Sequence, residues 1–154
     1  MAKYLTLLLS MVAFFGFSGC MEKNTLAEKT TREIAFPEAT YVQLYYSKNL
    51  SGNLTAGPRL NAAQISMLKK SVYIRQPDPD ESFPACFIPH HFFRFFNASG
   101  QQISEVQVCF CCGGFYVSGA GKLNVEDYEI FDGKLGRIEG LVRELGVATD
   151  INCD

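Results

Sequence analysis

The sequence has no tryptophan and no excess of basic residues, and its one long apolar run stands at the N-terminus. It holds 14 lysines and arginines against 16 aspartates and glutamates, so the formal net charge is −2, and no basic stripe is visible. Proteins that bind nucleic acid through its phosphates need such a stripe, and we therefore expect no nucleic-acid partner. The chain also lacks internal repeats, GxSxG, a P-loop, a dinucleotide fingerprint and HExxH. These absences remove the common enzyme signatures, and we expect a protein that is not an enzyme.

The N-terminal segment is typical of a bacterial lipoprotein signal peptide. Lys3 precedes an apolar stretch from Leu5 to Ser18, which is shorter than the roughly 20 residues that a transmembrane helix needs. Phe17-Ser-Gly-Cys20 resembles the lipobox, with Phe17 in place of the usual leucine. We expect cleavage before Cys20 and lipidation of Cys20, palmitate included. The alternative is an ordinary secreted protein that is cut near Gly19.

The lipid anchor predicts a location in the bacterial cell envelope, facing the periplasm or the cell surface. Two or more acyl chains hold a protein stably on a bilayer, at about 0.8 kcal/mol per buried CH₂. The protein would therefore sit on a membrane without spanning it. Residues 1–19 are the predicted signal peptide, residues 20–35 a polar tether, and residues 36–154 a single domain.

Strand-forming residues predict several antiparallel strands in this domain. Residues 41–46 are rich in strand formers, and the turn material of residues 47–58 allows a weak hairpin. The clearest hairpin joins residues 92–96 to residues 101–110 through an Asn-Ala-Ser-Gly turn. If Asn97 pairs with Gln102, like side chains face each other across the ladder, as cross-strand pairing favours. The pairs are then Arg94 with Glu105, Phe93 with Val106, and His91 with Val108.

Two helices complete the prediction. Asn61 is a good N-cap, and Gln64 stands where it would complete a capping box for a helix with Ile65 and Leu68 on its apolar face. A second helix is expected from Asp132, with Gly146 as its stop. Its inward positions are Leu135, Ile138, Val142 and Leu145. The predicted fold is therefore α+β, an antiparallel sheet with two amphipathic helices packed on one face.

Five cysteines follow Cys20: Cys86, Cys109, Cys111, Cys112 and Cys153. Their spacing alone does not reveal their connectivity. Extending the hairpin register, although Pro89 must distort it, places Cys86 near Cys112. This favours a Cys86–Cys112 bridge, with Cys86–Cys109 as the second choice. In the oxidising envelope such a bridge would staple the hairpin, and this structural role is our preferred interpretation.

Three chemical alternatives use the same residues. Cys86-x-x-x-His90 and Cys109-x-x-Cys112 have the spacing of ligand pairs for zinc or copper(I). Adjacent His90 and His91 point to opposite faces of a regular strand, so only one could join, and the register favours His90. Cys109-Phe-Cys-Cys112 is also a CxxC sequence, but active CxxC pairs usually stand at a helix N-terminus, whereas this one ends a strand. The last alternative is a nucleophile pair of Cys109 with His90.

These residues also resemble a pattern in small uncharacterised bacterial envelope lipoproteins. In that pattern C-[FY]-x-P-x-H precedes a hairpin that closes on C-F-x-C, and the resemblance covers residues 86–112. It implies an envelope location and no particular activity. It also implies His91 in the functional position, whereas the register favours His90, and both histidines stay open as candidates. The pattern positions are Cys86, Pro89, His91, Cys109 and Cys112, with Cys111 and Cys153 as additional cysteines.

We therefore interpret the chain as a membrane-anchored envelope lipoprotein that acts as a non-enzymatic binding or accessory module. Its hairpin is stabilised by a disulfide, it needs no cofactor, and its partner is an unidentified protein or small molecule. The alternative is an envelope protein that binds zinc or copper(I) through its cysteine and histidine cluster. The ligands in that case come from Cys86, His90, His91, Cys109 and Cys112.

Overall fold

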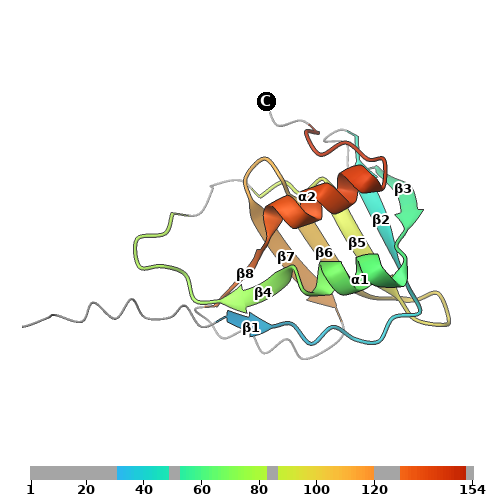
Figure 1. The fold of residues 1–154 in the computed structure, drawn as a ribbon, viewed down its shortest axis with the longest axis horizontal. Helices are drawn as coiled ribbons and strands as arrows, with labels where there is room; N and C mark the ends of the chain where they lie inside the picture. Colours follow the sequence, from blue (N-terminus) through green and yellow to red (C-terminus); the bar gives the residue numbers. More distant parts are fainter. Residues whose placement is uncertain (1–30, 49–52, 83–86, 120–128, 152–154) are drawn as a thin grey trace, which may run out of the picture.

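The computed structural model describes residues 31–48, 53–82, 87–119 and 129–151. Within these ranges, eight strands form two antiparallel sheets, and two short helices accompany them (Figure 1). The predicted α+β class is therefore confirmed, with sheet as the dominant part. No helix in the described part of the chain is both long and apolar enough to cross a membrane.

The larger sheet has five strands in the order β3-β2-β5-β6-β7. Along β5 the residues alternate between buried and half-buried, which is the pattern of a sheet with one face on the core. Strand β3 lies at an edge, where Pro58 can be accommodated because it has no N–H to donate. The strands are β2 (Tyr41–Ser47), β3 (Leu54–Arg59), β5 (His91–Phe96), β6 (Gln102–Cys109) and β7 (Gly114–Gly119).

The smaller sheet has three strands in the order β1-β4-β8. They are β1 (Thr31–Glu33), β4 (Val72–Arg75) and β8 (Ile130–Gly133). Strand β1 pairs with β4, and Ile34, the residue that follows β1 in the sequence, is buried in the core. Residues 31–34 therefore belong to the folded part and not to the predicted tether, and the predicted boundary at residue 36 is too late. Backbone pairing of a short polar strand leaves little trace in hydrophobic patterning.

Both helices lie over the same side of the five-stranded sheet (Figure 1). Helix α1 (Ala62–Lys69) has the predicted capping box, with Asn61 and Gln64 exchanging side-chain to backbone hydrogen bonds of 2.9 Å each. Helix α2 (Leu135–Glu144) ends at Gly146, whose φ is +73°, in a Schellman motif. Asp132, predicted to begin this helix, instead lies in β8.

The β5–β6 hairpin has the predicted register along most of its length. Arg94 pairs with Glu105, Phe93 with Val106 and His91 with Val108. Near the turn an irregularity makes Phe96 the partner of Gln102, in place of Asn97. Asn97 instead uses its side-chain oxygen to accept hydrogen bonds from the N–H groups of Ser99 and Gln101.

The core fills the space between the five-stranded sheet and the helices. Its largest fully buried side chains include two phenylalanines of β5 and aliphatic residues of β2, α1, β4 and α2. They are Phe93, Phe95, Leu44, Leu68, Ile74, Ile138 and Leu141. Burying such side chains is the main favourable term that holds the two helices on the sheet.

Candidate functional site

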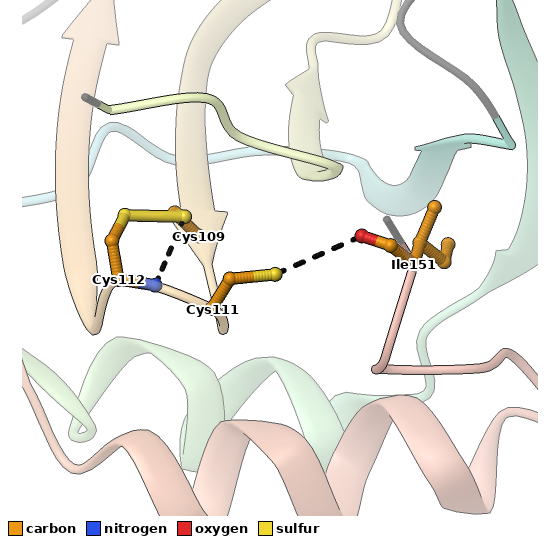
Figure 2. The surroundings of a disulfide bond; sticks show 4 residues. All are labelled: Cys109, Cys111, Cys112 and Ile151. Carbon is orange, nitrogen blue, oxygen red and sulfur yellow. Dashed lines mark hydrogen bonds between the residues drawn. A yellow bond between two sulfur atoms is a disulfide. The ribbon is translucent and has the colours of Figure 1, made fainter. Parts of the chain in front are cut away.

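The cysteine turn, residues 109–113, joins β6 to β7. Cys109 pairs with Gly114 at the end of the ladder, so the chain reverses through residues 110–113. Gly113 has a φ of +68°, a left-handed conformation that glycine adopts without strain. Across this turn Cys109 and Cys112 form a disulfide with their Cα atoms 5.6 Å apart (Figure 2).

This disulfide corrects the predicted connectivity. Cys112 is bonded to Cys109, so the expected Cys86–Cys112 bridge and its second choice, Cys86–Cys109, are both wrong. The prediction assumed that β6 continues straight past Cys109, whereas the turn brings Cys112 back onto Cys109. Cys20, Cys86 and Cys153 lie outside the described residues.

Cys111 stands between the two bonded cysteines in sequence but is directed elsewhere. Figure 2 shows its side chain pointing away from the Cys109–Cys112 bridge, and its Sγ atom lies 3.7 Å from the carbonyl oxygen of Ile151. Cys111 is itself disulfide-bonded. The cysteine turn therefore contacts two parts of the chain. Its disulfide joins Cys112 to the end of β6, and Cys111 contacts the C-terminal segment.

Both histidines are buried. His90 precedes β5 and is 4% exposed, and His91 begins β5 and is 1% exposed. The Nε2 atom of His91 lies 2.7 Å from the carbonyl oxygen of Ala148, and its ring meets the ring of Phe110 edge-on at 4.8 Å. Burial lowers the pKa of both imidazoles, which keeps them neutral.

The structure does not assemble the predicted metal ligands. Cys109 and Cys112 are joined to each other, and a metal requires thiolates. His91 uses Nε2 on the backbone of Ala148, and the buried Nδ1 atoms of both histidines have no hydrogen-bond partner among the residues that the structure describes. Among the described residues, no group of three or more histidine, cysteine or carboxylate side chains is placed to hold a metal ion. Cys86, the remaining candidate ligand, is outside these residues.

A groove of about 540 Å³ runs beside the cysteine turn, where the edge strands β7 and β8 of the two sheets approach each other. We call it the β7–β8 groove and define it by Arg75, Glu81, Phe87, Cys112, Tyr116, Phe131 and Asp132. Aromatic rings form its walls, and Tyr116 meets Phe131 edge-on at 6.0 Å. Phe87 and Tyr116 are exposed by 39% and 48%, so the groove presents two aromatic side chains to solvent.

A fixed charge cluster forms one end of the groove. The Arg75 side chain is 9% exposed and bridges the carboxylates of Glu81 and Asp132. It also donates to the backbone oxygen of Gln76 at 3.0 Å. These carboxylates raise the pKa of the guanidinium well above its usual value, so Arg75 stays charged. Glu129 also lines the groove, so carboxylates outnumber guanidinium groups among the described residues that line it, although Arg32 pairs with Glu129 from β1.

Sequence reasoning missed this groove because its residues come from four separate segments. Arg75 ends a buried strand and is followed by an acidic loop, and this was the one local signal of a buried ion pair. Tyr116 and Phe131 carried no signal, since aromatic residues are frequent in strands of every kind.

Comparison of the chain with protein-family models, with curated proteins and with solved structures finds no match in any of the three.

Proposed function

We propose that this protein is a lipid-anchored bacterial envelope protein whose domain is a binding module, with the β7–β8 groove as its binding site. The observation that carries the proposal is the groove itself, in which exposed aromatic walls end at the nearly buried Arg75 guanidinium and its two carboxylate partners. Pockets of this size with mostly apolar walls and a few fixed polar groups are the usual form of a ligand site.

The groove suits an extended polypeptide segment that carries apolar and basic side chains. Phe87 and Tyr116 offer rigid aromatic surface, the kind of side chain that supplies most of the affinity at protein interfaces. The surplus of carboxylates favours a positively charged group over a negatively charged one. Lysine or arginine beside an aromatic residue would also contact the ring faces, where cations bind favourably.

The membrane anchor supports the same role. The segment Phe17-Ser-Gly-Cys20 supports lipidation of Cys20, which would hold the domain at a membrane surface. A binding module in that position meets other envelope proteins at high local concentration. The proposed partner is therefore an envelope polypeptide, and binding is the domain's main role.

Fluorescence anisotropy with a labelled peptide of alternating phenylalanine and lysine tests the groove. We expect binding to the full chain in detergent, weakened about tenfold or more in Tyr116→Ser, because truncation of an aromatic hot-spot residue costs about 2 kcal/mol or more. Ile88→Ser is the matched control, since Ile88 is exposed by 47% but does not line the groove. A second peptide with glutamate in place of lysine should bind more weakly than the first. Equal affinity of Tyr116→Ser and Ile88→Ser for the first peptide would refute the proposed site.

A further inference from the structure

The Cys109–Cys112 bridge stands at the rim of the β7–β8 groove, because Cys112 is one of the residues that line it. We propose that this bridge is redox-active and exchanges with the thiols of a cysteine-containing polypeptide bound in the groove, with Cys112 as the sulfur that is attacked. The position of the substrate rests on the proposed function, whereas the exchange itself does not.

The two sulfurs of the bridge differ in accessibility. Cys109 is the last residue of β6 and is only 3% exposed, so an incoming thiolate cannot approach it through the sheet. Cys112 is half-buried and faces the groove. Disulfide exchange requires direct attack of a thiolate on one sulfur, and accessibility therefore selects Cys112.

The cysteine turn also holds a hydrogen-bond donor at the sulfur that would leave. The backbone N–H of Cys112 donates to Cys109 Sγ at 3.3 Å (Figure 2). A donor at this sulfur favours its thiolate form and so makes Cys109 a better leaving group. Active CxxC pairs usually obtain this stabilisation from a helix N-terminus, and here the turn supplies it without a helix.

Gly114 keeps the neighbourhood of Cys112 open. A Cβ atom at this position would lie 3.7 Å from Cys112 Sγ and only 2.7 Å from the ring of Phe87. The missing side chain therefore lets an aromatic wall of the groove lie beside the reactive sulfur. A polypeptide that rests on Phe87 would carry its own cysteine to Cys112.

The reaction balances with a dithiol polypeptide as the co-reactant. Its first thiolate attacks Cys112 Sγ, the Cys109–Cys112 bond breaks, and Cys109 leaves as a thiolate while a mixed disulfide forms at Cys112. The second thiolate of the polypeptide then attacks the polypeptide's first sulfur in that mixed disulfide and releases the Cys112 thiolate. The polypeptide loses two electrons and two protons and gains a disulfide, and the protein takes up the electrons as two thiols.

Exchange in the native state is the first test. The oxidised full chain is incubated with 2-mercaptoethanol, new thiols are alkylated, and fragment-ion mass spectrometry assigns them among Cys109, Cys111 and Cys112. We expect Cys109 and Cys112 to be modified while circular dichroism shows a folded protein. Modification that requires unfolding urea, or that is confined to Cys111, would overturn the proposal, because a purely structural bridge behaves in that way.

Variants in which one of the two bridge cysteines is replaced by serine test which sulfur is attacked. In Cys109→Ser, Cys112 should form a mixed disulfide with oxidised 2-mercaptoethanol about tenfold or more faster than Cys109 does in Cys112→Ser, since burial protects Cys109. Equal rates, or a faster Cys109, would overturn the assignment. The exchange test on the unmodified chain keeps the proposal testable if a variant fails to fold.

A third measurement tests the disulfide exchange and the placement of the substrate in the groove separately. The substrate is the phenylalanine and lysine peptide with two added cysteines, and its reaction rate is divided by the rate with 2-mercaptoethanol. We expect Tyr116→Ser to lower this ratio about tenfold, with Ile88→Ser as control. A ratio that does not fall overturns the placement in the groove even if small thiols exchange. Failure of small thiols to exchange overturns the redox role even if the peptide binds.

Discussion

At the scale of single residues, Arg75 is the charged side chain on which the β7–β8 groove depends. It is nearly buried and is held by two carboxylates from different segments, Glu81 in the loop after β4 and Asp132 in β8. Its loss would leave both carboxylates near each other without a cation. Removing one partner from a buried ion pair is far more costly than removing the whole pair.

We predict that Arg75→Gln lowers the free energy of unfolding by about 2–4 kcal/mol. Arg143→Gln is the control, because Arg143 is 68% exposed and pairs with Glu139 one helical turn away. Such a surface pair contributes only about 0.5 kcal/mol. Urea denaturation of both variants measures the difference. Similar losses for the two would show that the Arg75 cluster is no more stabilising than a surface ion pair.

The buried histidines predict a stability that depends on pH. Burial lowers the pKa of His90 and His91 in the folded state, whereas in the unfolded chain they titrate near the usual value of about 6.5. Above that pH both are neutral in both states. As the pH falls below it, only the unfolded chain takes up protons, so the free energy of unfolding decreases until the folded-state pKa values are reached.

Urea denaturation at about pH 7.5, 6.5 and 5.5 should therefore show progressively lower stability. The double variant with His90→Gln and His91→Gln should be less stable at pH 7.5, by about 1–3 kcal/mol, because it disturbs the buried bond to Ala148. Its stability should also change less with pH than that of the unmodified chain. An unchanged pH dependence in the double variant would assign the effect to other groups.

At the scale of elements, α1 begins at a capping box and α2 ends at a Schellman motif. Helix α1 has only eight residues, and Leu68 is its one fully buried side chain, so its cap contributes a large share of its stability. Helix α2 is longer, buries Ile138, Leu141 and Val142, and has no side-chain cap at its start. Packing therefore holds both helices on the sheet, and α1 has a side-chain cap in addition.

We predict that Asn61→Ala lowers the melting temperature, with a cost of about 1 kcal/mol, because the N–H of Gln64 loses its acceptor. Asn61→Asp is the control, since aspartate also accepts from that N–H and is as good an N-cap. Thermal denaturation followed by circular dichroism compares the two. A loss of the same size in both variants would mean that the amide itself, and not the cap, is required.

At the scale of the whole molecule, the proposed function assigns membrane attachment to the N-terminal segment and binding to the β7–β8 groove. The two sheets meet at β7 and β8, which are edge strands within the described part of the chain, and the groove lies where these edges approach each other. The proposed lipidation would then determine where this groove operates. Anchoring and binding can be tested independently because they use different parts of the chain.

We predict that Cys20→Ser abolishes acylation and moves the protein from the membrane fraction to the soluble fraction, because the acyl chains supply the membrane affinity. Fractionation of cells with immunodetection measures the distribution, and mass spectrometry of the N-terminal peptide measures the lipid. Cys153→Ser is a matched control that leaves the proposed lipobox intact. If Cys20→Ser still sediments with membranes and the unmodified protein carries no lipid, the lipoprotein interpretation is wrong.

Local interactions explain how much of the fold was predictable from sequence. The capping box of α1, the Gly146 stop of α2 and the pairing of Arg94 with Glu105 each depend on short-range geometry or on alternating polarity. Residue identity alone therefore determined these features, because few competing conformations satisfy the same hydrogen bonds.

Only the tertiary structure decided the candidate site. The disulfide partner of Cys112 depends on where β6 ends, and that end depends on a turn which hydrophobic patterning does not locate. The burial of His91 depends on a C-terminal segment that packs back onto the sheet from far along the chain. The groove exists because Arg75, Tyr116 and Phe131 meet where two sheets join. Contacts between residues so distant in sequence are set by the packing of the whole domain, and no local pattern records them.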